Sequence, residues 1–395
     1  MEYGKELAVY AAERKDVCMK NDAIPGNLYQ EYGVKRGLRD EQGRGVLAGL
    51  TNISAVISMK EVDGVRTACD GELWYRGYNV KNLVNAYGKT GHGFEITAYL
   101  LLFGELPTQE QFDEFMRMLG LARQLPVNFT RDVIMKAPSK DIMNSMTRSI
   151  LTLASYDQNM ASNDIDNCIR QALQLIAEFP MLAAYGYHAY NHYENDQSMY
   201  IHKPDNSLST AENLLRMLRS DMQYTELEAK VLDVALMLHM EHGGGNNSTF
   251  TTRVVTSSGT DTYSAIAAAM SSLKGPKHGG ANIKVMEMMA DIKSHVRNWE
   301  DRAEVKDYLA KMLDGEVFDH KGLIYGMGHA VYSISDPRER IFKGYVQKLS
   351  EAKNRQRDMG LYSMIEEVAP ELIGEKRKIF KGGSPNVDFY SGFVY

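Results

Sequence analysis

The sequence predicts an all-α protein of two domains, since helical patterns recur along it and strand-like alternation is rare. Apolar residues repeat every three or four positions, which places them on one helix face. One such stripe, on a helix expected to meet Pro180, consists of Ile165, Ile169, Leu173 and Ile176. Capping boxes of the form Ser/Thr-x-x-Glu start further helices at 209–212 and 225–228. The one strand-like stretch is 251–256, where we still expect a helix.

Length and a change in composition support the two domains. The chain has 395 residues, more than the roughly 250 to 300 that a single core usually serves. Residues 263–273 are small and apolar on every side, which predicts a central buried helix. Residues 291–321 are rich in charge with one apolar stripe, as in the outer helix of a more solvated unit. We therefore predict a large helical domain over 1–279 and a small lid domain over 280–395.

Bulk composition excludes several classes of protein. The formal net charge of -6 disfavours a nucleic-acid partner, which normally binds a basic face. No apolar run approaches the roughly 20 residues that a membrane helix needs, so no membrane association is predicted. The first residues lack the basic and apolar regions of a signal peptide, and a cytoplasmic location is therefore expected. The three cysteines lie far apart, so neither a disulfide framework nor a Cys-x-x-Cys metal site is predicted.

His278 lies in a glycine-rich turn before a helix that we expect to begin near Ala281. The free N–H groups and the positive dipole end of that helix favour a neutral imidazole over an imidazolium. A neutral imidazole can donate a hydrogen bond to an oxygen that gains negative charge. The segment by itself fits equally well a histidine that only caps a loop.

His329 and Arg338 belong to a second segment. Asp336 is a good N-cap, and Pro337 suits the first helical position. Glu339 completes the spacing of a capping box, so Arg338 is expected in the first turn of a helix. A guanidinium beside free helical N–H groups is a strong site for a carboxylate. The alternative is an ordinary capped helix with a solvated arginine.

Asp388 lies among apolar and aromatic residues in the segment 385–390. Such surroundings raise the pKa of a carboxyl group towards the range that suits a general base. The alternative is an acidic residue that caps a turn or a helix.

Two histidine pairs suggest a metal site as a rival interpretation. His239 and His242 match neither His-Glu-x-x-His nor its inverse, and no third ligand is evident. His188 and His192 lie among tyrosines, which favours an aromatic packing face over metal ligands. We therefore predict no bound metal, with a metallohydrolase as the rival class.

Taken together, four segments resemble the citrate synthases in order and spacing. They are His239-x-x-His242-Gly-Gly-Gly-Asn246, Gly275-Pro276-x-His278-Gly279-Gly280-Ala281-Asn282, Gly328-His329-Ala330-Val331-Tyr332 followed by Asp336-Pro337-Arg338, and Asn386-Val387-Asp388. The resemblance extends upstream to 45–51 and to 70–77, so it covers most of the chain after about residue 35. It implies the two-domain helical fold of that family.

The resemblance implies that the chain is an acyltransferase that condenses acetyl-CoA with oxaloacetate and water, giving citrate and CoA through an enol(ate). Asp388 would remove the methyl proton, and His278 would stabilise the enolate. His329 would protonate the ketone oxygen of oxaloacetate. The residues expected to bind the substrates are His242, Asn246 and Arg338 for oxaloacetate, and Lys381 and Arg44 for coenzyme A.

The resemblance also implies a homodimer, a coenzyme A thioester as substrate and no permanently bound cofactor. The family's chains continue beyond the Asp388 motif into further helices of the large domain, which supply more arginines to the site, whereas this sequence ends at Tyr395. We therefore expect a chain that lacks its C-terminal segment. Two alternative functions follow: 2-methylcitrate synthesis from propionyl-CoA, which differs by one methylene, and an inactive truncated form.

Overall fold

The computed structural model describes residues 25–33, 51–276, 278–328, 331–377 and 383–394. Chain contacts divide the protein into two compact units, 1–49 and 50–395. The described part of the first unit holds one short helix, α2 (Gly26–Glu31). All other elements belong to the second unit, and the following paragraphs concern that unit alone.

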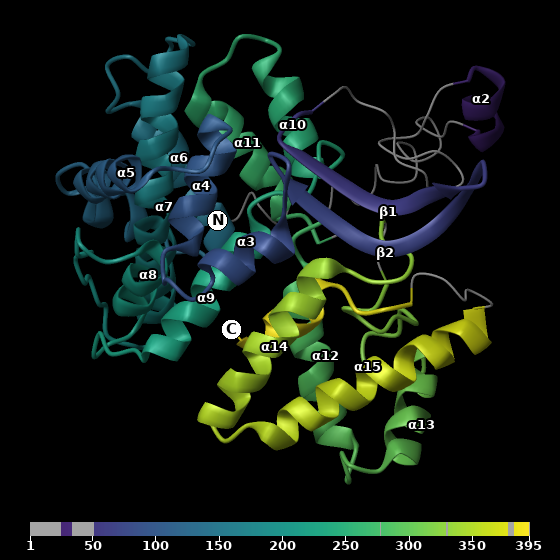
Figure 1. The fold of residues 1–395 in the computed structure, drawn as a ribbon. Coiled ribbons are helices and arrows are strands. Elements are labelled where there is room, and N and C mark those ends of the chain that lie inside the picture. Colours follow the sequence, from purple (N-terminus) through teal and green to yellow (C-terminus); the bar gives the residue numbers. More distant parts are fainter. Residues whose placement is uncertain (1–24, 34–50, 277, 329–330, 378–382, 395) are drawn as a thin grey trace. The chain divides into compact units, whose positions relative to one another are not determined.

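Helices dominate the second unit, which agrees with the predicted all-α class (Figure 1). Before the glycine-rich turn they are α3 (Val80–Tyr87), α4 (Gly93–Phe103), α5 (Gln109–Ala122), the short π-helix η1 (Thr130–Ile134), α6 (Ile142–Ala154), α7 (Ile165–Glu194), α8 (Thr210–Leu218), α9 (Glu226–His239), α10 (Asn247–Thr256) and α11 (Thr262–Leu273). After it they are α12 (Ala281–His295), α13 (Arg302–Leu313), α14 (Pro337–Ala352), α15 (Gln356–Arg377) and α16 (Val387–Val394).

A β-hairpin precedes these helices, and the sequence analysis missed it. Strand β1 (Ser54–Val62) pairs antiparallel with β2 (Val65–Tyr75), whose end pairs with the two-residue strand β3 (Tyr78–Asn79). Asp63 and Gly64 form the turn with φ of 52° and 76°, the positive values of a type I′ turn. An Asp-Gly pair between two strand-like runs is a hairpin signal that could have identified it.

Residues 251–256 form the end of α10, as predicted, despite their β-branched composition. Thr251, Thr252 and Thr256 each donate a hydrogen bond from Oγ1 to the carbonyl four residues earlier, at 2.8, 2.9 and 2.7 Å. The helix itself therefore satisfies these hydroxyl groups, which removes the usual competition between threonine side chains and the helical backbone.

The predicted capping boxes are confirmed, and the helix expected to meet Pro180 does so and continues beyond it. Both boxes are complete at the starts of α8 and α9. Helix α7 passes through Pro180 and continues to Glu194. The buried Met181 and Leu182 follow the proline directly, and tertiary packing of this kind offsets the hydrogen bond that proline cannot make.

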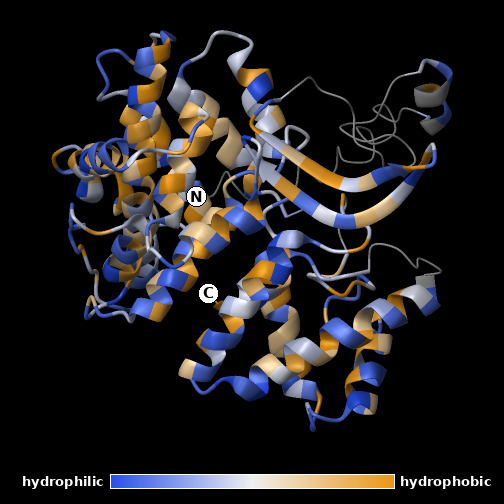
Figure 2. Ribbon diagram, in the orientation of Figure 1, coloured by the Kyte–Doolittle hydropathy of each residue, from blue (hydrophilic) through white to orange (hydrophobic). Residues whose placement is uncertain are grey.

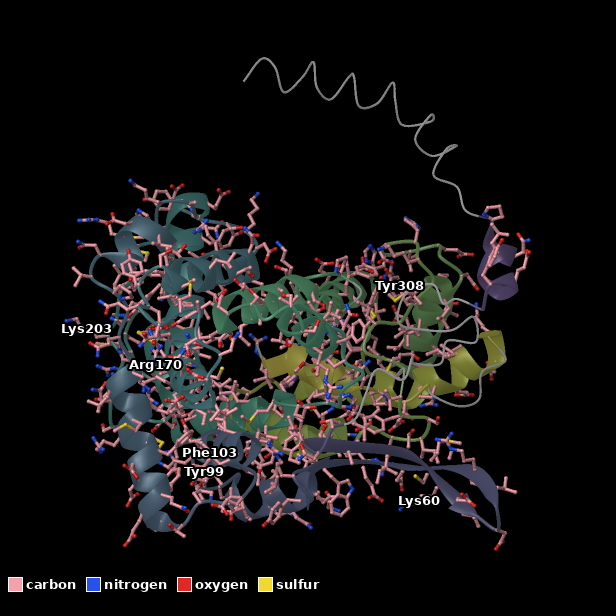
Figure 3. All side chains as sticks on the ribbon, turned by 90° about the horizontal axis from the view of Figure 1, so that it is seen from above. Lys60, Tyr99, Phe103, Arg170, Lys203 and Tyr308 are labelled. Atoms are coloured by element: carbon pink, nitrogen blue, oxygen red, sulfur yellow. The ribbon has the colours of Figure 1, made fainter. Side chains whose placement is uncertain are left out.

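Apolar and polar residues alternate along the helices of the second unit, as the orange and blue bands of Figure 2 show. The largest buried cluster joins β2, α3 and α9 to α12–α16. A second joins α6, α7 and α11, and a smaller one joins α4, α5 and α7. Tyr99, which packs against the smaller cluster, has its ring centroid 4.6 Å from that of the more exposed Phe103, also on α4 (Figure 3).

The predicted boundary near residue 280 stays a prediction, since the division into 1–49 and 50–395 lies elsewhere. The charged stretch after it does contain a helix with one apolar stripe, since α13 buries Val305, Leu309 and Met312. Within the described ranges, none of the helices combines the length and the apolarity that crossing a membrane requires.

A carboxylate on α9 caps the start of α4 across the core. Oδ2 of the buried Asp233 accepts a hydrogen bond from Gly93 N at 2.8 Å, and Oδ1 accepts one from Phe94 N at 2.9 Å. His92, the residue before α4, makes no capping hydrogen bond with its side chain. Asp233 thus satisfies two N–H groups that the helix cannot satisfy itself.

Replacing Asp233 with alanine should lower the free energy of unfolding by about 2 to 3 kcal/mol, because two backbone donors lose their acceptor in the core. Urea unfolding followed by circular dichroism measures the change. Asp113→Ala, on the exposed face of α5, is the matched control and should change stability by less than about 0.5 kcal/mol. Equal effects of the two substitutions would contradict the capping role.

Candidate active site

Asp388 occupies the second position of α16, a helix whose other side chains are mostly buried. The side-chain Oδ1 of Asn386 accepts a hydrogen bond from Asp388 N at 3.0 Å and so caps the helix start. The neighbouring Phe389 and Tyr390 are fully buried. Local capping and core packing therefore fix the backbone that carries the Asp388 carboxylate.

His278 lies in the turn between α11 and α12, as predicted. Its Nε2 is 2.9 Å from Oγ of Ser248, in the first turn of α10. Within the described chain, Nδ1 of His278 has no hydrogen-bond partner. The turn requires glycine, because a Cβ on Gly279 would lie 2.3 Å from the carbonyl oxygen of Leu273. The tight turn fixes the backbone of His278, and in the described chain Ser248 contacts only the Nε2 side of its imidazole.

Burial shifts the pKa values of these two groups in opposite directions. Loss of hydration raises the pKa of Asp388, while the nearby His239, Arg338 and His278 partly offset that rise. Loss of hydration lowers the pKa of His278. Both shifts follow from the cost of burying a charge. The result is a more basic carboxylate and an imidazole whose neutral form is favoured.

His239 and His242 lie at the end of α9 and just after it. Nδ1 of His239 donates a hydrogen bond to the carbonyl oxygen of Ala235 at 2.7 Å, which leaves Nε2 unprotonated in the neutral ring. Although the His239 residue is partly exposed to solvent, the surrounding protein reduces the hydration of its imidazole and so lowers the pKa of His239. His242 Nε2 is 3.2 Å from the hydroxyl of the buried Tyr332.

Arg338 lies in the first turn of α14, as predicted, but it is not a solvated arginine. Only 7% of the residue is exposed, and Asp336 accepts its Nη2–H at 2.7 Å and its Nε–H at 3.1 Å. Asp336 also accepts Arg338 N at 2.9 Å. The predicted capping box does not close, since Oε1 of Glu339 is buried without a partner in the described chain. Burial raises the pKa of Glu339 to about 8.

The hairpin contacts the segment just before α14. Strand pairing is irregular where Asp70 and Gly71 lie, and such bulges redirect side chains. Asp70 accepts a hydrogen bond from Oγ of Ser335 at 2.8 Å and pairs with Arg340 at 3.1 Å. A Cβ on Gly71 would lie 2.2 Å from the Ser335 carbonyl oxygen. Only glycine allows this strand so close to the Arg338 segment.

Arg338 and His278 thus lie close enough to Asp388 for their charges to lower its pKa. Asn246 is the N-cap of α10, where its Oδ1 accepts Ser248 N at 2.9 Å and Thr249 N at 3.4 Å. This role orients the serine that contacts His278.

Three predicted site residues, His329, Lys381 and Arg44, lie outside the described residues. Ser248 was missed by the sequence analysis. A serine two positions after a capping asparagine is a weak sequence signal. Its role becomes apparent only from its contact with His278, thirty positions later in the chain.

The other histidine pair packs among aromatic rings. His188 is buried, with its Nε2 2.8 Å from the Met217 carbonyl oxygen and its ring against Tyr187 and Tyr200. Nδ1 of His192 is 2.9 Å from the Gln197 carbonyl oxygen. The packing interpretation is therefore confirmed for His188. Among the described residues, no three His, Cys, Asp or Glu side chains are placed to share a metal ion.

Comparison with known sequences shows to which family the chain belongs. The sequence model of the family described as "Citrate synthase, C-terminal domain" matches residues 37–395. The chain belongs to the citrate synthase family. It is 34% identical to the citrate synthase of Synechocystis sp., over 88% of this chain and 79% of the relative. It is also 33% identical to the 2-methylcitrate synthase of Shewanella oneidensis, over 82% and 77%.

Solved structures agree with this membership. A citrate synthase from Pyrobaculum aerophilum superposes with a TM-score of 0.70 at 26% identity, covering 89% of this chain and 80% of that one. A citrate synthase from Thermoplasma acidophilum superposes with a TM-score of 0.72 at 24% identity, covering 89% and 82%. The latter was solved as a ternary complex with oxaloacetate and carboxymethyl coenzyme A. Its low identity supports the fold alone.

Replacing Ser248 with alanine in this citrate synthase family member should lower kcat about 10-fold, because His278 loses the contact that fixes its ring and tautomer. KM for the dicarboxylate should change less than about twofold, since Ser248 is expected to act on the His278 imidazole and not on the dicarboxylate. Steady-state kinetics measures both constants.

Ser257→Ala is the control, since within the described residues its exposed hydroxyl at the end of α10 bonds only to the Val254 carbonyl. An unchanged kcat for Ser248→Ala would show that the serine does not orient His278.

Proposed function

We propose that this chain is a citrate synthase, an acyltransferase that condenses acetyl-CoA with oxaloacetate and water to give citrate and CoA. One observation carries the proposal: a carboxylate with a raised pKa, Asp388, lies near a neutral imidazole, His278, whose Nδ1 has no partner in the described chain. Enolate chemistry needs this combination of a base and a donor. Family membership supports the same reaction.

The first step is removal of a proton from the methyl carbon of acetyl-CoA. The proton goes to the Asp388 carboxylate, and the C–H electron pair moves to the thioester oxygen as an enolate. In this proposal the Ser248 hydroxyl donates a hydrogen bond to Nε2 of His278, so the ring proton of the neutral imidazole lies on Nδ1. The Nδ1–H group then donates to the enolate oxygen. A donor of this kind typically contributes about 3 to 4 kcal/mol to transition-state stabilisation.

The second step forms the carbon–carbon bond. The enolate carbon attacks the ketone carbon of oxaloacetate, and His329 gives a proton to the ketone oxygen. His242, Asn246 and Arg338 orient the two carboxylates of oxaloacetate in this proposal. Support comes from the buried Arg338, whose charge lowers the pKa of Asp388, and from the contact of His242 with the Tyr332 hydroxyl. Water then hydrolyses the thioester and releases CoA with its thiol.

Coenzyme A enters as a thioester substrate, with no permanently bound cofactor in the proposed reaction. Lys381 and Arg44 are proposed to contact its phosphates, because lysine and arginine are the usual phosphate ligands. Support for these two substrates comes from membership of the citrate synthase family and from relatives named citrate synthase.

We further propose a homodimer in the cytoplasm that serves the tricarboxylic acid cycle. Helix α10 has no buried residue, and it exposes Val254 while α6 exposes Leu151. Two exposed apolar side chains do not by themselves indicate an interface, so the proposal of a homodimer rests on membership of the citrate synthase family. Cys69 and Cys168 are free thiols, which are typical of a reducing compartment.

The purified chain should release CoA thiol from acetyl-CoA only when oxaloacetate is present. His278→Ala and Asp388→Ala should each lower the rate at least about 100-fold, because the enolate loses its donor or its base. A thiol-reactive dye follows the release.

Asp113→Ala and His295→Ala, which change exposed residues, are the controls and should keep the wild-type rate. Absence of thiol release from the wild-type chain would favour an inactive form. Release without oxaloacetate would indicate a thioesterase.

The relatives include a citrate synthase and a 2-methylcitrate synthase, so 2-methylcitrate synthesis is the second candidate function. We expect kcat/KM for acetyl-CoA to exceed that for propionyl-CoA by about 10-fold or more, since one methylene in an acyl pocket is worth about 1 to 3 kcal/mol. The same thiol assay with the two thioesters measures the ratio. A preference for propionyl-CoA would overturn citrate as the product.

A further inference from the structure

Asn386 uses both ends of its side-chain amide. Oδ1 accepts a hydrogen bond from Asp388 N at 3.0 Å, at the start of α16. Nδ2 donates to the carbonyl oxygen of Gly328 at 2.8 Å. The backbone N–H of Asn386 also donates to the Gly326 carbonyl at 2.9 Å. One residue therefore joins the helix of Asp388 to a backbone segment fifty-eight positions earlier.

The segment that Asn386 contacts is held at more than one point. Gly328 N donates to the Ser384 carbonyl at 2.8 Å, and Oγ of Ser384 donates to the Ile334 carbonyl at 2.7 Å. Met327 forms an antiparallel bridge with Pro385. Residues 384–386 thus bind both ends of 328–334, the stretch whose sequence contains His329.

Close packing leaves this segment little freedom to shift. Gly326 and Gly328 have φ of +79° and +86°, values that favour glycine. A Cβ on Gly326 would lie 2.8 Å from Cδ2 of Phe389 and 2.9 Å from Cγ2 of Val285. The backbone of 326–328 therefore lies directly against α16, one residue from Asp388.

We propose that Asn386 is a positioning residue for the reaction, whose side-chain amide sets the separation between the Asp388 helix and the Gly326–Gly328 backbone. The proposal rests on the proposed function, in which Asp388 is the base and the residue after Gly328 belongs to the oxaloacetate site. A displacement of about 1 Å between reacting groups can cost about 100-fold in rate.

Capping alone does not require asparagine at this position. Serine caps a helix about as well, since its hydroxyl also accepts from the N2 or N3 backbone N–H. Asparagine adds a donor, the Nδ2–H that reaches Gly328. Asn79 shows the simpler case: it caps α3 by accepting Lys81 N at 2.9 Å and makes no other side-chain hydrogen bond in the described chain.

Two substitutions separate the two roles. Asn386→Ser keeps a capping acceptor but loses the donor to Gly328, whereas Asn386→Ala loses both. Both should lower kcat with acetyl-CoA and oxaloacetate about 10- to 100-fold, with KM for acetyl-CoA changed less than about threefold. The matched controls Asn79→Ser and Asn79→Ala should keep the wild-type kcat. A wild-type kcat for Asn386→Ser would overturn the proposal and leave only a helix cap.

Hydrogen exchange read by mass spectrometry gives a second result that does not depend on turnover. In the substrate-free protein, peptides covering 323–334 should exchange faster in Asn386→Ser than in wild type, and at the wild-type rate in Asn79→Ser. Unchanged exchange would overturn the proposal even if kcat fell. If the wild-type chain had no turnover, the proposed function would fail, while exchange alone would still decide whether Asn386 holds this segment.

Discussion

The packing of α16 against α12, α14 and α15 is the constraint on which the rest of the site depends. Tyr362 of α15 stacks near Phe389 and Tyr390, with ring centroids 5.1 and 6.1 Å away. The Tyr390 hydroxyl donates to Glu366, and Asn282 of α12 donates to Oγ of Ser391 at 2.7 Å. A helix of eight residues is too short to be stable alone. Its neighbours therefore determine where the Asp388 carboxylate lies.

That packing also sets the chemistry of the site through hydration. Bringing Asp388 and His278 into a partly dehydrated region disfavours the charged form of each. The pKa of the carboxyl group rises and that of the imidazole falls. One physical cause thus yields a stronger base and a neutral donor, without a separate charged partner for either.

Glycines make the required close approaches possible on several sides. Gly71 lets the hairpin reach Ser335, Gly279 closes the turn that carries His278, and Gly326 lies against Phe389. A side chain at any of these positions would meet backbone or ring atoms that have no room to move. Two capping side chains also join separate segments. Asp233 of α9 caps the start of α4, and Asn386 caps its own helix α16 while it donates to the Gly328 carbonyl.

The sequence by itself determined the helical class, the capped starts of α8 and α9, and the segments that carry His278, Arg338 and Asp388. These features depend on residues a few positions apart, so periodicity, capping and local motifs reveal them. The β-hairpin also has a local signal, its Asp-Gly turn. Only the tertiary structure decided the passage of α7 through Pro180.

The same holds for the contacts that complete the site. Ser248 with His278 and Asn386 with Gly328 join residues thirty and fifty-eight positions apart. The burial of Arg338 against Asp336 depends on the packing of α14 against the core, which a local helix-start motif does not reveal. Sequence patterns report which residues share a helix face, whereas these contacts depend on how separate helices fold back on one another.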